Sequence, residues 1–180
     1  MATHSQLIPF SELAPGQAAK VRSDIVGTLV AEACKILNKT QDALVVRDIR
    51  AASDIALYSK GAAVAVEDWG CVTGATINAY ETMATGTMTD MRWVGIFGVT
   101  INEYCACTAL KFNIGGSDRI IWQMQSLRED DYWTGFSPAG VIIPPNAPYT
   151  ISRWVRHASD SAFIFLKAVV VEPRGLVVSP

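Results

Sequence analysis

The sequence predicts a mainly β protein, an antiparallel sandwich or barrel preceded by one α-helix. Three observations support this fold class. About eight short apolar segments have the composition of strands and are separated by polar turns. Only one long stretch, residues 17–38, has helical periodicity. With 180 residues the chain fits one domain, which is large enough to bury a core without disulfides.

The helix is predicted from apolar residues that recur every four positions. Val21, Ile25 and Leu29 lie on one face of residues 17–38, and further apolar side chains widen the stripe to a second face. Asn38 is a suitable C-terminal stop. The stripe is wider than contact with one sheet requires. The helix therefore either packs over the β domain or docks on a neighbouring subunit, and we favour the first arrangement.

The predicted strands are short segments rich in β-branched and aromatic residues. Polar turns at 115–118, 137–140 and 157–161 separate several of them. The last segment is apolar on both sides, so it needs cover on both faces. The segments are 43–49, 62–69, 91–101, 107–114, 119–127, 140–144, 148–156 and 162–173.

A proline-rich corner, GVIIPPNAPYTISRW, occupies residues 140–154. Pro144, Pro145 and Pro148 lack backbone donors and therefore belong at strand ends and edges. Asn146 can adopt turn geometry. We predict a rigid corner at which one strand leaves a sheet and the next joins the other sheet, as in jelly-roll topology. The complete prediction is a single jelly-roll-like antiparallel β-sandwich or barrel with one N-terminal α-helix.

The low content of charged residues suggests that the chain assembles. Half of the residues are apolar and 18% are charged, against roughly 25% charged in an average soluble domain. We therefore expect part of the surface to be covered by copies of the chain or by partner proteins.

The sequence is predicted to divide into four parts. They are an N-terminal extension (1–16), a helix and short strand arm (17–60), the sandwich domain (61–173) and a C-terminal tail (174–180).

Charge and hydropathy exclude two classes of partner. The net charge is −2 and the sequence pI is about 5.6, which gives no basic footprint for nucleic acid. No apolar run approaches the ~20 residues of a membrane span. The N-terminus, MATHSQLIPFSEL, lacks the basic region and apolar core of a signal peptide. Folding in a cytoplasm is the expectation.

No pattern of catalytic or metal-binding residues stands out, so we expect no enzyme, no cofactor and no metal. The chain has only His4 and His157 as imidazole ligands, too few for a cupin-like metal site. The turn RHASDS at 156–161 contains the residue types of a hydrolytic triad, but triad members converge from separate backbone positions. Cys105 and Cys107 lie on one side of a predicted strand, and buried thiols are favoured there over a redox pair.

The segment REDDYWTGF, residues 128–136, is the predicted interaction site. Three consecutive carboxylates precede the aromatic side chains of Tyr132, Trp133 and Phe136. A solvated acidic loop, a calcium site and a sugar-binding platform are the alternatives. We favour a protein–protein contact, because exposed Trp and Tyr beside a charged rim are typical of interface anchors.

These features together resemble a known group of proteins. A one-helix, all-β chain with a VIIPPNAPYTI corner, a long apolar last strand and the tail EPRGLVVSP is similar to jelly-roll capsid and head-decoration proteins of bacteriophages and related viruses. The resemblance covers residues 60–173. It implies a non-enzymatic virion structural protein, capsid or cement, which assembles in the host cytoplasm with itself and with other virion proteins through apolar interfaces.

One departure from the resemblance and one alternative function complete the prediction. Shells that line nucleic acid often carry a basic arm, whereas the N-terminus here is nearly neutral, so we expect no direct contact with nucleic acid. The alternative function is a carbohydrate- or protein-binding β-sandwich module, such as a phage receptor-binding or adhesion domain.

Overall fold

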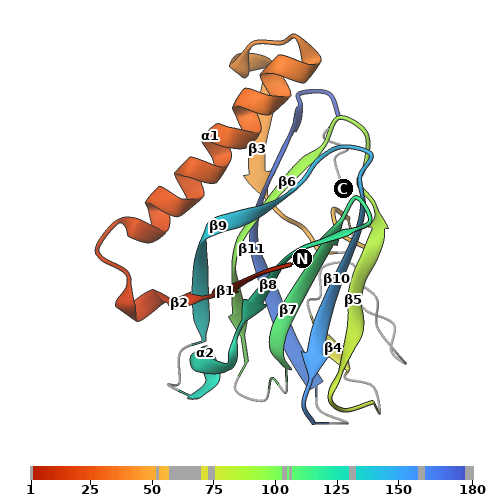
Figure 1. Cartoon of the computed structure of the whole chain (residues 1–180). Helices are drawn as coiled ribbons and strands as arrows, with labels where there is room; N and C mark the ends of the chain where they lie inside the picture. The colour runs from red at the N-terminus through yellow and green to blue at the C-terminus, as the bar shows by residue number, and fades with distance from the viewer. Residues whose placement is uncertain are drawn as a thin grey trace.

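The structure is a computed structural model that describes residues 2–51, 53–56, 70–72, 76–102, 105, 107–129, 133–157 and 161–176. Two β-sheets pack face to face as a sandwich, and one long helix lies against the outside of the second sheet (Figure 1). The predicted fold class is confirmed in its sandwich form. The predicted strand at 62–69 lies outside the described residues.

The strands are β1 (Thr3–Gln6), β2 (Ile8–Pro9), β3 (Leu44–Asp48), β4 (Gly70–Val72), β5 (Ala79–Thr87), β6 (Trp93–Ile101), β7 (Cys107–Ile114), β8 (Ser117–Gln123), β9 (Thr134–Ile143), β10 (Pro148–Val155) and β11 (Ser161–Pro173). The α-helices are α1 (Gln17–Leu37) and α2 (Gln125–Glu129), and single 3₁₀ turns occupy Phe10–Glu12 and Gln41–Ala43.

The strand order is that of a jelly roll. One sheet has the order β1-β8-β7-β10-β5, and the other has the order β2-β9-β6-β11-β3, with β4 added to β11. Among the longer strands, β3 pairs with β11, β5 with β10, β6 with β9 and β7 with β8, all antiparallel. These are the pairs of one long antiparallel hairpin that has been rolled into two sheets. Below, the sheet that contains β10 is called sheet A, and the sheet that contains β11 is called sheet B.

The proline corner joins the two sheets, as predicted. The chain leaves sheet B at the end of β9 and enters sheet A at the start of β10. Asn146 has a left-handed backbone with φ +59°. Its N–H donates to the Met88 carbonyl at 3.1 Å, and the Ala147 N–H donates to the Pro144 carbonyl at 3.3 Å. The corner is thus tied both to itself and to the connection between β5 and β6.

The main core fills the space between the sheets with apolar side chains. Phe112 and Trp122 meet edge to face with their ring centroids 4.6 Å apart. Met83, Leu110 and Ile96 are also fully buried in this cluster. These large side chains pack closely and fill the interior of the sandwich.

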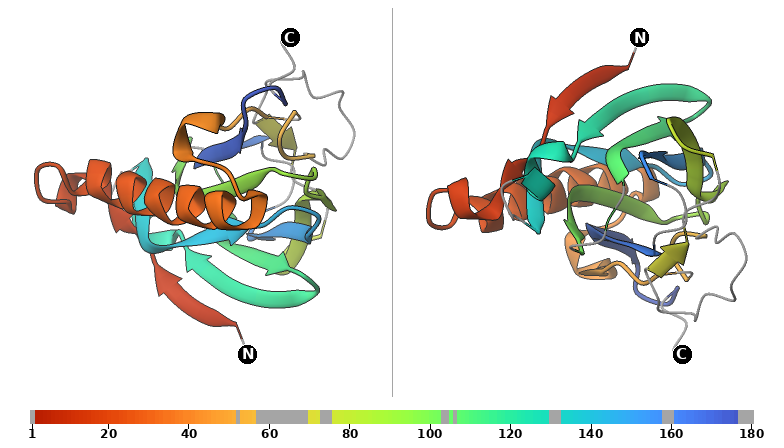
Figure 2. Two further views of the ribbon diagram at one scale, coloured as in Figure 1. Left: turned by 90° about the horizontal axis from the view of Figure 1, so that it is seen from above. Right: turned by 90° about the horizontal axis from the view of Figure 1, so that it is seen from below.

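Two connecting segments close the open sides of the sandwich. On one side the chain passes from β1 in sheet A to β2 in sheet B, and Leu7 between them is buried in the core. On the other side residues 49–56 pass from β3 toward β5, with Ile49 and Ile55 buried. There the Ala56 N–H donates to Tyr149 Oη at 2.9 Å. Figure 2 shows the sandwich from both ends with these segments at its sides.

Helix α1 covers much of the outer face of sheet B. Ile25 and Leu29 pack in a second apolar cluster with Trp93, Val169 and other side chains of that face. The contact is close, because a Cβ atom added at Gly95 would overlap Ile25 and lie 2.8 Å from Leu29. The favoured arrangement, a helix packed over the β domain, is confirmed, and it supplies the second cover that β11 needs. In the described part of the chain, no helix combines the length and apolarity of a membrane span.

Several boundaries differ from the sequence prediction. The predicted strand 119–127 ends at Gln123, where α2 soon follows, and β5 was missed. Strand β9 begins at Thr134, although residues 137–140 were predicted as a turn. Those residues bulge out of the sheet, because the pairing shifts between Ile96 and Gly98 of β6 and Gly140 has φ +54°. A local turn signal therefore lies inside a longer strand.

The first 48 residues contribute strands to both sheets. Strands β1 and β2 fall in the predicted extension 1–16, and β3 falls in the predicted arm 17–60. β1 joins sheet A, whereas β2 and β3 join sheet B. The division of the chain into four parts stays a prediction.

Candidate interaction groove beside helix α1

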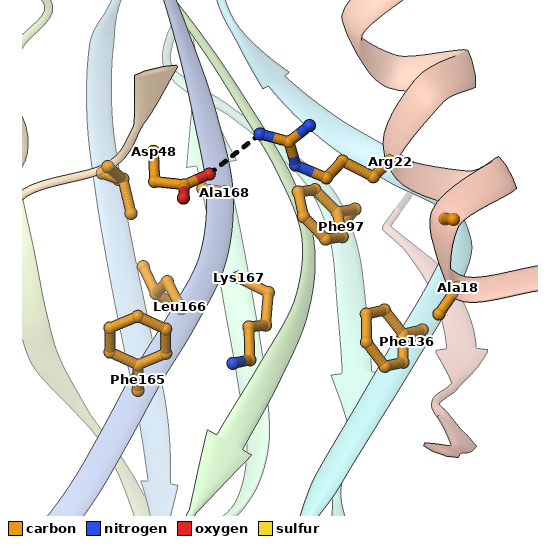
Figure 3. Close-up of a pocket in the computed structure, with 11 residues that line it drawn as sticks. Ala18, Arg22, Asp48, Phe97, Phe136, Phe165, Leu166, Lys167 and Ala168 are labelled. Carbon is orange, nitrogen blue, oxygen red and sulfur yellow. Dashed lines mark hydrogen bonds and ion pairs between the residues drawn. The ribbon is translucent and has the colours of Figure 1, made fainter. Parts of the chain in front are cut away.

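A groove of about 370 Å³ lies between the start of α1 and the outer face of sheet B (Figure 3). The helix crosses the sheet obliquely and leaves part of β6, β9 and β11 uncovered beside its first turns (Figure 1). Ala18 and Ala19 line the helix side of the groove, and their small side chains leave this space open. Farther along the helix, Ile25 and Leu29 fill the corresponding space.

The walls of the groove are aromatic. Phe97 of β6 and Phe136 of β9 stack with their ring centroids 6.1 Å apart and an interplanar angle of 14°. Phe165 of β11 lines the groove as well. Phe10, whose side chain is 59% exposed, extends the aromatic row with its centroid 6.0 Å from that of Phe136. Such a surface favours contact with another flat apolar group.

Three charged side chains border the aromatic walls. Arg22 of α1 donates to Asp48 of β3 at 3.1 Å, and both side chains are well exposed. Lys167 Nζ of β11 lies 4.8 Å from the centroid of the Phe165 ring, a cation–π contact. No ion pair among the described residues includes Lys167. Among the described lining residues there are thus two cations and one carboxylate, which is one positive charge in excess.

Of the predicted interface residues that the structure describes, Phe136 lines this groove. Phe136 is 7% exposed and forms part of its wall. Trp133, immediately before β9, is 38% exposed, and its carbonyl accepts from the Ile101 N–H at 2.8 Å. Tyr132 lies outside the described residues. The structure thus brings Phe136 into the groove wall and leaves Trp133 exposed three positions earlier in the sequence, and their role in an interface stays a prediction.

The other candidate groups of the sequence do not come together in the described structure. His4 lies on β1, where its Nδ1 is 3.3 Å from Gln123 Nε2, and His157 is an exposed residue after β10. Cys105 and Cys107 are buried thiols, as predicted. Within the described residues, no group of three or more His, Cys, Asp or Glu side chains could hold a metal ion.

Sequence reasoning missed a buried network of two arginines and two carboxylates. Arg47 of β3 donates to Asp54 through Nη1 and Nη2 at 2.6 and 2.7 Å, and through Nε to Glu172 of β11 at 2.8 Å. Arg92 donates through Nε to Glu172 at 2.8 Å and lies 3.1 Å from Asp54. Both carboxylate side chains are only 1% exposed. The network anchors the segment 49–56 to the sandwich.

The charges of the network balance each other. Burial alone would raise the pKa of Asp54, but hydrogen bonds from Arg47 and from the Arg50 N–H, together with the nearby positive charges, hold it below its ordinary value. The pKa of Arg47 is raised, mainly by its hydrogen bonds to Asp54. No short sequence motif could have revealed this arrangement, because Arg47 and Glu172 are 125 positions apart.

A second buried ion pair lies between the two sheets. Arg153 of β10 faces Glu81 of β5 with Nη2 3.4 Å from Oε2, and the two residues are directly opposite in the strand register. Arg153 is 2% exposed. Arg153 is two positions from each of the core residues Ile151 and Val155. The three side chains therefore lie on the same side of the strand, and that of Arg153 points into the sandwich. The interior at this point is ionic rather than apolar.

The fold and the groove together define a jelly-roll sandwich with a helix across one sheet and an aromatic surface beside that helix. No known protein family matches the chain, and no curated protein matches it.

Proposed function

We propose that this chain is a non-enzymatic virion structural protein, a capsid or capsid-decorating (cement) subunit that assembles with itself and with other virion proteins. The observation that carries the proposal is the jelly-roll pairing of β3 with β11, β5 with β10, β6 with β9 and β7 with β8. Viral capsid domains, lectins and cupins share this architecture. The choice among these classes rests on the interior and the surface.

The interior favours a structural role over a cupin-like enzyme. Cupin-type chemistry uses a metal held by several histidines between the sheets. Here large side chains such as Met83, Phe112 and Trp122 occupy that space. The buried charges of Arg153 and Glu81 are paired with each other.

The surface favours assembly. Phe10, beside the groove residue Phe136, is 59% exposed, and Trp133 is 38% exposed. Ile36, Ile77 and Met91 are exposed elsewhere, at 61%, 51% and 41%. The aromatic groove with Phe10 beside Phe136 is an exposed apolar surface, and such surfaces mark sites of protein contact. Together with the low content of charged residues, it supports burial of part of the surface against other subunits.

Sedimentation velocity and light scattering of the purified protein test self-assembly. We expect a homo-oligomer or a lattice whose mass rises with concentration, and electron microscopy should show its form. A stable monomer at high concentration would contradict the proposal. Mass spectrometry of particles purified from the source culture tests the virion assignment, and the chain should be present in many copies per particle.

A second candidate function is a carbohydrate- or protein-binding module such as a phage receptor-binding or adhesion domain. The exposed indole of Trp133 favours it, because a flat apolar face can stack on a sugar ring. A glycan array separates the two functions. Specific glycan binding by a monomer, lost in Trp133→Ala, would favour the binding module.

A further inference from the structure

The groove beside α1 combines a row of aromatic rings with one lysine that belongs to no ion pair of the described residues. We propose that it receives an extended segment of a partner protein with two apolar side chains at alternate positions and an acidic side chain at the next alternate position. This inference deepens the proposed assembly with other virion proteins and rests on that part of the proposed function. It states the chemistry of the segment that the groove recognises.

The aromatic row has the spacing of side chains on one face of a strand. The ring centroids of Phe10 and Phe136 are 6.0 Å apart, and those of Phe136 and Phe97 are 6.1 Å apart. Residues two positions apart on a strand are separated by ~6.4–6.8 Å. Two apolar side chains of one extended segment can therefore contact successive rings. An extended segment is also narrower than a helix, whose diameter with side chains is ~10–12 Å, and it suits a groove of about 370 Å³.

Lys167 continues the row with a positive charge. Gly98 of β6 is the register partner of both Phe136 on β9 and Lys167 on β11. Residues directly opposite each other in a sheet have side chains on the same face, and both Phe136 and Lys167 line the groove. Neighbouring strands are ~4.8 Å apart, so the backbones at Phe136 and Lys167 are roughly 10 Å apart. A segment that crosses these strands therefore meets the aromatic rings and then the ammonium group.

The charge of the groove selects a carboxylate. Lys167 Nζ lies 4.8 Å from the centroid of the Phe165 ring (Figure 3). Arg22, the other cation among the described lining residues, is already paired with Asp48 at 3.1 Å. The described lining residues thus have one positive charge in excess, and Lys167 supplies it. An acidic side chain is its complement, and such a pair adds specificity to an apolar contact.

Fluorescence polarisation with labelled synthetic peptides tests the pairing on the full chain. The peptides GSFSFSEG and GESFSFSG carry the proposed pattern in the two chain directions. At least one should bind, and its form with glutamine in place of glutamate should bind about threefold to fivefold more weakly, as expected for one partly exposed ion pair. Lys167→Gln should weaken binding of the acidic peptide by the same factor and leave binding of the glutamine form unchanged.

Two substitutions on α1 test whether the peptide binds in the groove. Ala19 is an exposed residue that lines the groove. Ala19→Trp places a large side chain there and should weaken binding by about tenfold or more. Ala31→Trp is the matched control, because Ala31 is also exposed on α1 and lies apart from the described lining residues; it should bind the peptide like the unmodified chain. A thermal melt of each variant checks that the protomer is folded.

The outcomes separate this inference from the proposed function. Binding that needs the acidic residue, Lys167 and an open groove would support the inference. Equal affinity for the acidic and glutamine forms would refute it, and so would binding that Ala19→Trp leaves unchanged.

Two other occupants of the groove give different results. If neither peptide binds, while the unmodified chain self-associates and Ala19→Trp does not, a second copy fills the groove and the inference is overturned. If dodecanoate binds and neither peptide does, the groove takes a free aliphatic carboxylate and the inference is again overturned. Sedimentation and particle mass spectrometry decide the proposed function independently of the peptide result.

Discussion

Replacement of Asp54 by Asn tests whether the buried charge network holds the segment 49–56 in place. The Asp54 carboxylate accepts two hydrogen bonds from Arg47 and one from the Arg50 N–H, and it lies 3.1 Å from Arg92 Nη1. Asparagine keeps the size of the side chain but removes its charge. It also turns an NH₂ group toward a guanidinium donor. The guanidinium groups of Arg47 and Arg92 would then have only the carboxylate of Glu172 as a negatively charged partner in the network.

The expected loss follows from the burial of the partners. Removal of one partner of a buried pair typically costs ~3–5 kcal/mol. The side chains of Arg47 and Arg92 are 17% and 13% exposed. Water can therefore reach them in part, and we expect the lower end, about 3 kcal/mol. For a chain of this size that corresponds to a fall in melting temperature of roughly 6–12 °C.

Urea denaturation followed by circular dichroism measures the effect. The control is Asp48→Asn, which removes the ion pair between Asp48 and Arg22. The Asp48 side chain is 82% exposed. This substitution should change the free energy of unfolding by less than about 0.5 kcal/mol. A loss below about 1 kcal/mol in Asp54→Asn would refute the view that this network stabilises the fold.

The same carboxylate makes the protein sensitive to acid. The pKa of Asp54 is lowered in the folded state, whereas in the unfolded chain it is ~3.9. Its contribution to stability is therefore present above about pH 4 and is lost as the pH falls through the folded-state pKa. Stability measured across this range should fall less steeply in Asp54→Asn than in the unmodified chain. Equal slopes would contradict the assignment of the lowered pKa to Asp54.

Three further changes test the corner, the predicted interface and the helix contact. Pro144→Gly with Pro145→Gly should lower stability by roughly 1–2 kcal/mol, because glycine gives the unfolded chain more freedom; an unchanged melting temperature would show that the prolines do not fix the corner. Trp133→Ala should weaken assembly by ~2 kcal/mol or more and leave the protomer melt unchanged; a normal oligomer with lost glycan binding would contradict this. Gly95→Ala should destabilise the protomer by about 1–3 kcal/mol, because its methyl group would overlap Ile25, and a neutral result would mean that α1 shifts freely.

The elements that could be predicted from sequence are those whose signals are local. Residues 17–38 carry a helical stripe, and α1 spans Gln17–Leu37 with Asn38 in the left-handed region after it. The prolines of the corner 140–148 act through their own backbone, so their effect was predictable. The exposed aromatic Trp133 was also found from its local context.

The elements that were missed depend on partners distant in the sequence. Strand β5 contains few β-branched apolar residues and is held by its pairing with β10. The bulge in β9 depends on the register of β6. The charge network needs β3 and β11 to be adjacent, and the groove exists because α1 crosses sheet B obliquely. A single sequence shows the residues but not these juxtapositions.

The central position of β11 has a consequence for the order in which the chain can fold. Strand β11, the last strand in the described part of the chain, lies between β6 and β3 and also pairs with β4. During synthesis, sheet B and the face that α1 covers stay incomplete until residues 161–173 leave the ribosome. Contacts of such long sequence separation slow folding. Apolar surface is therefore exposed on the nascent chain, and a ribosome that stalls before residue 161 would release a polypeptide without the middle of a sheet.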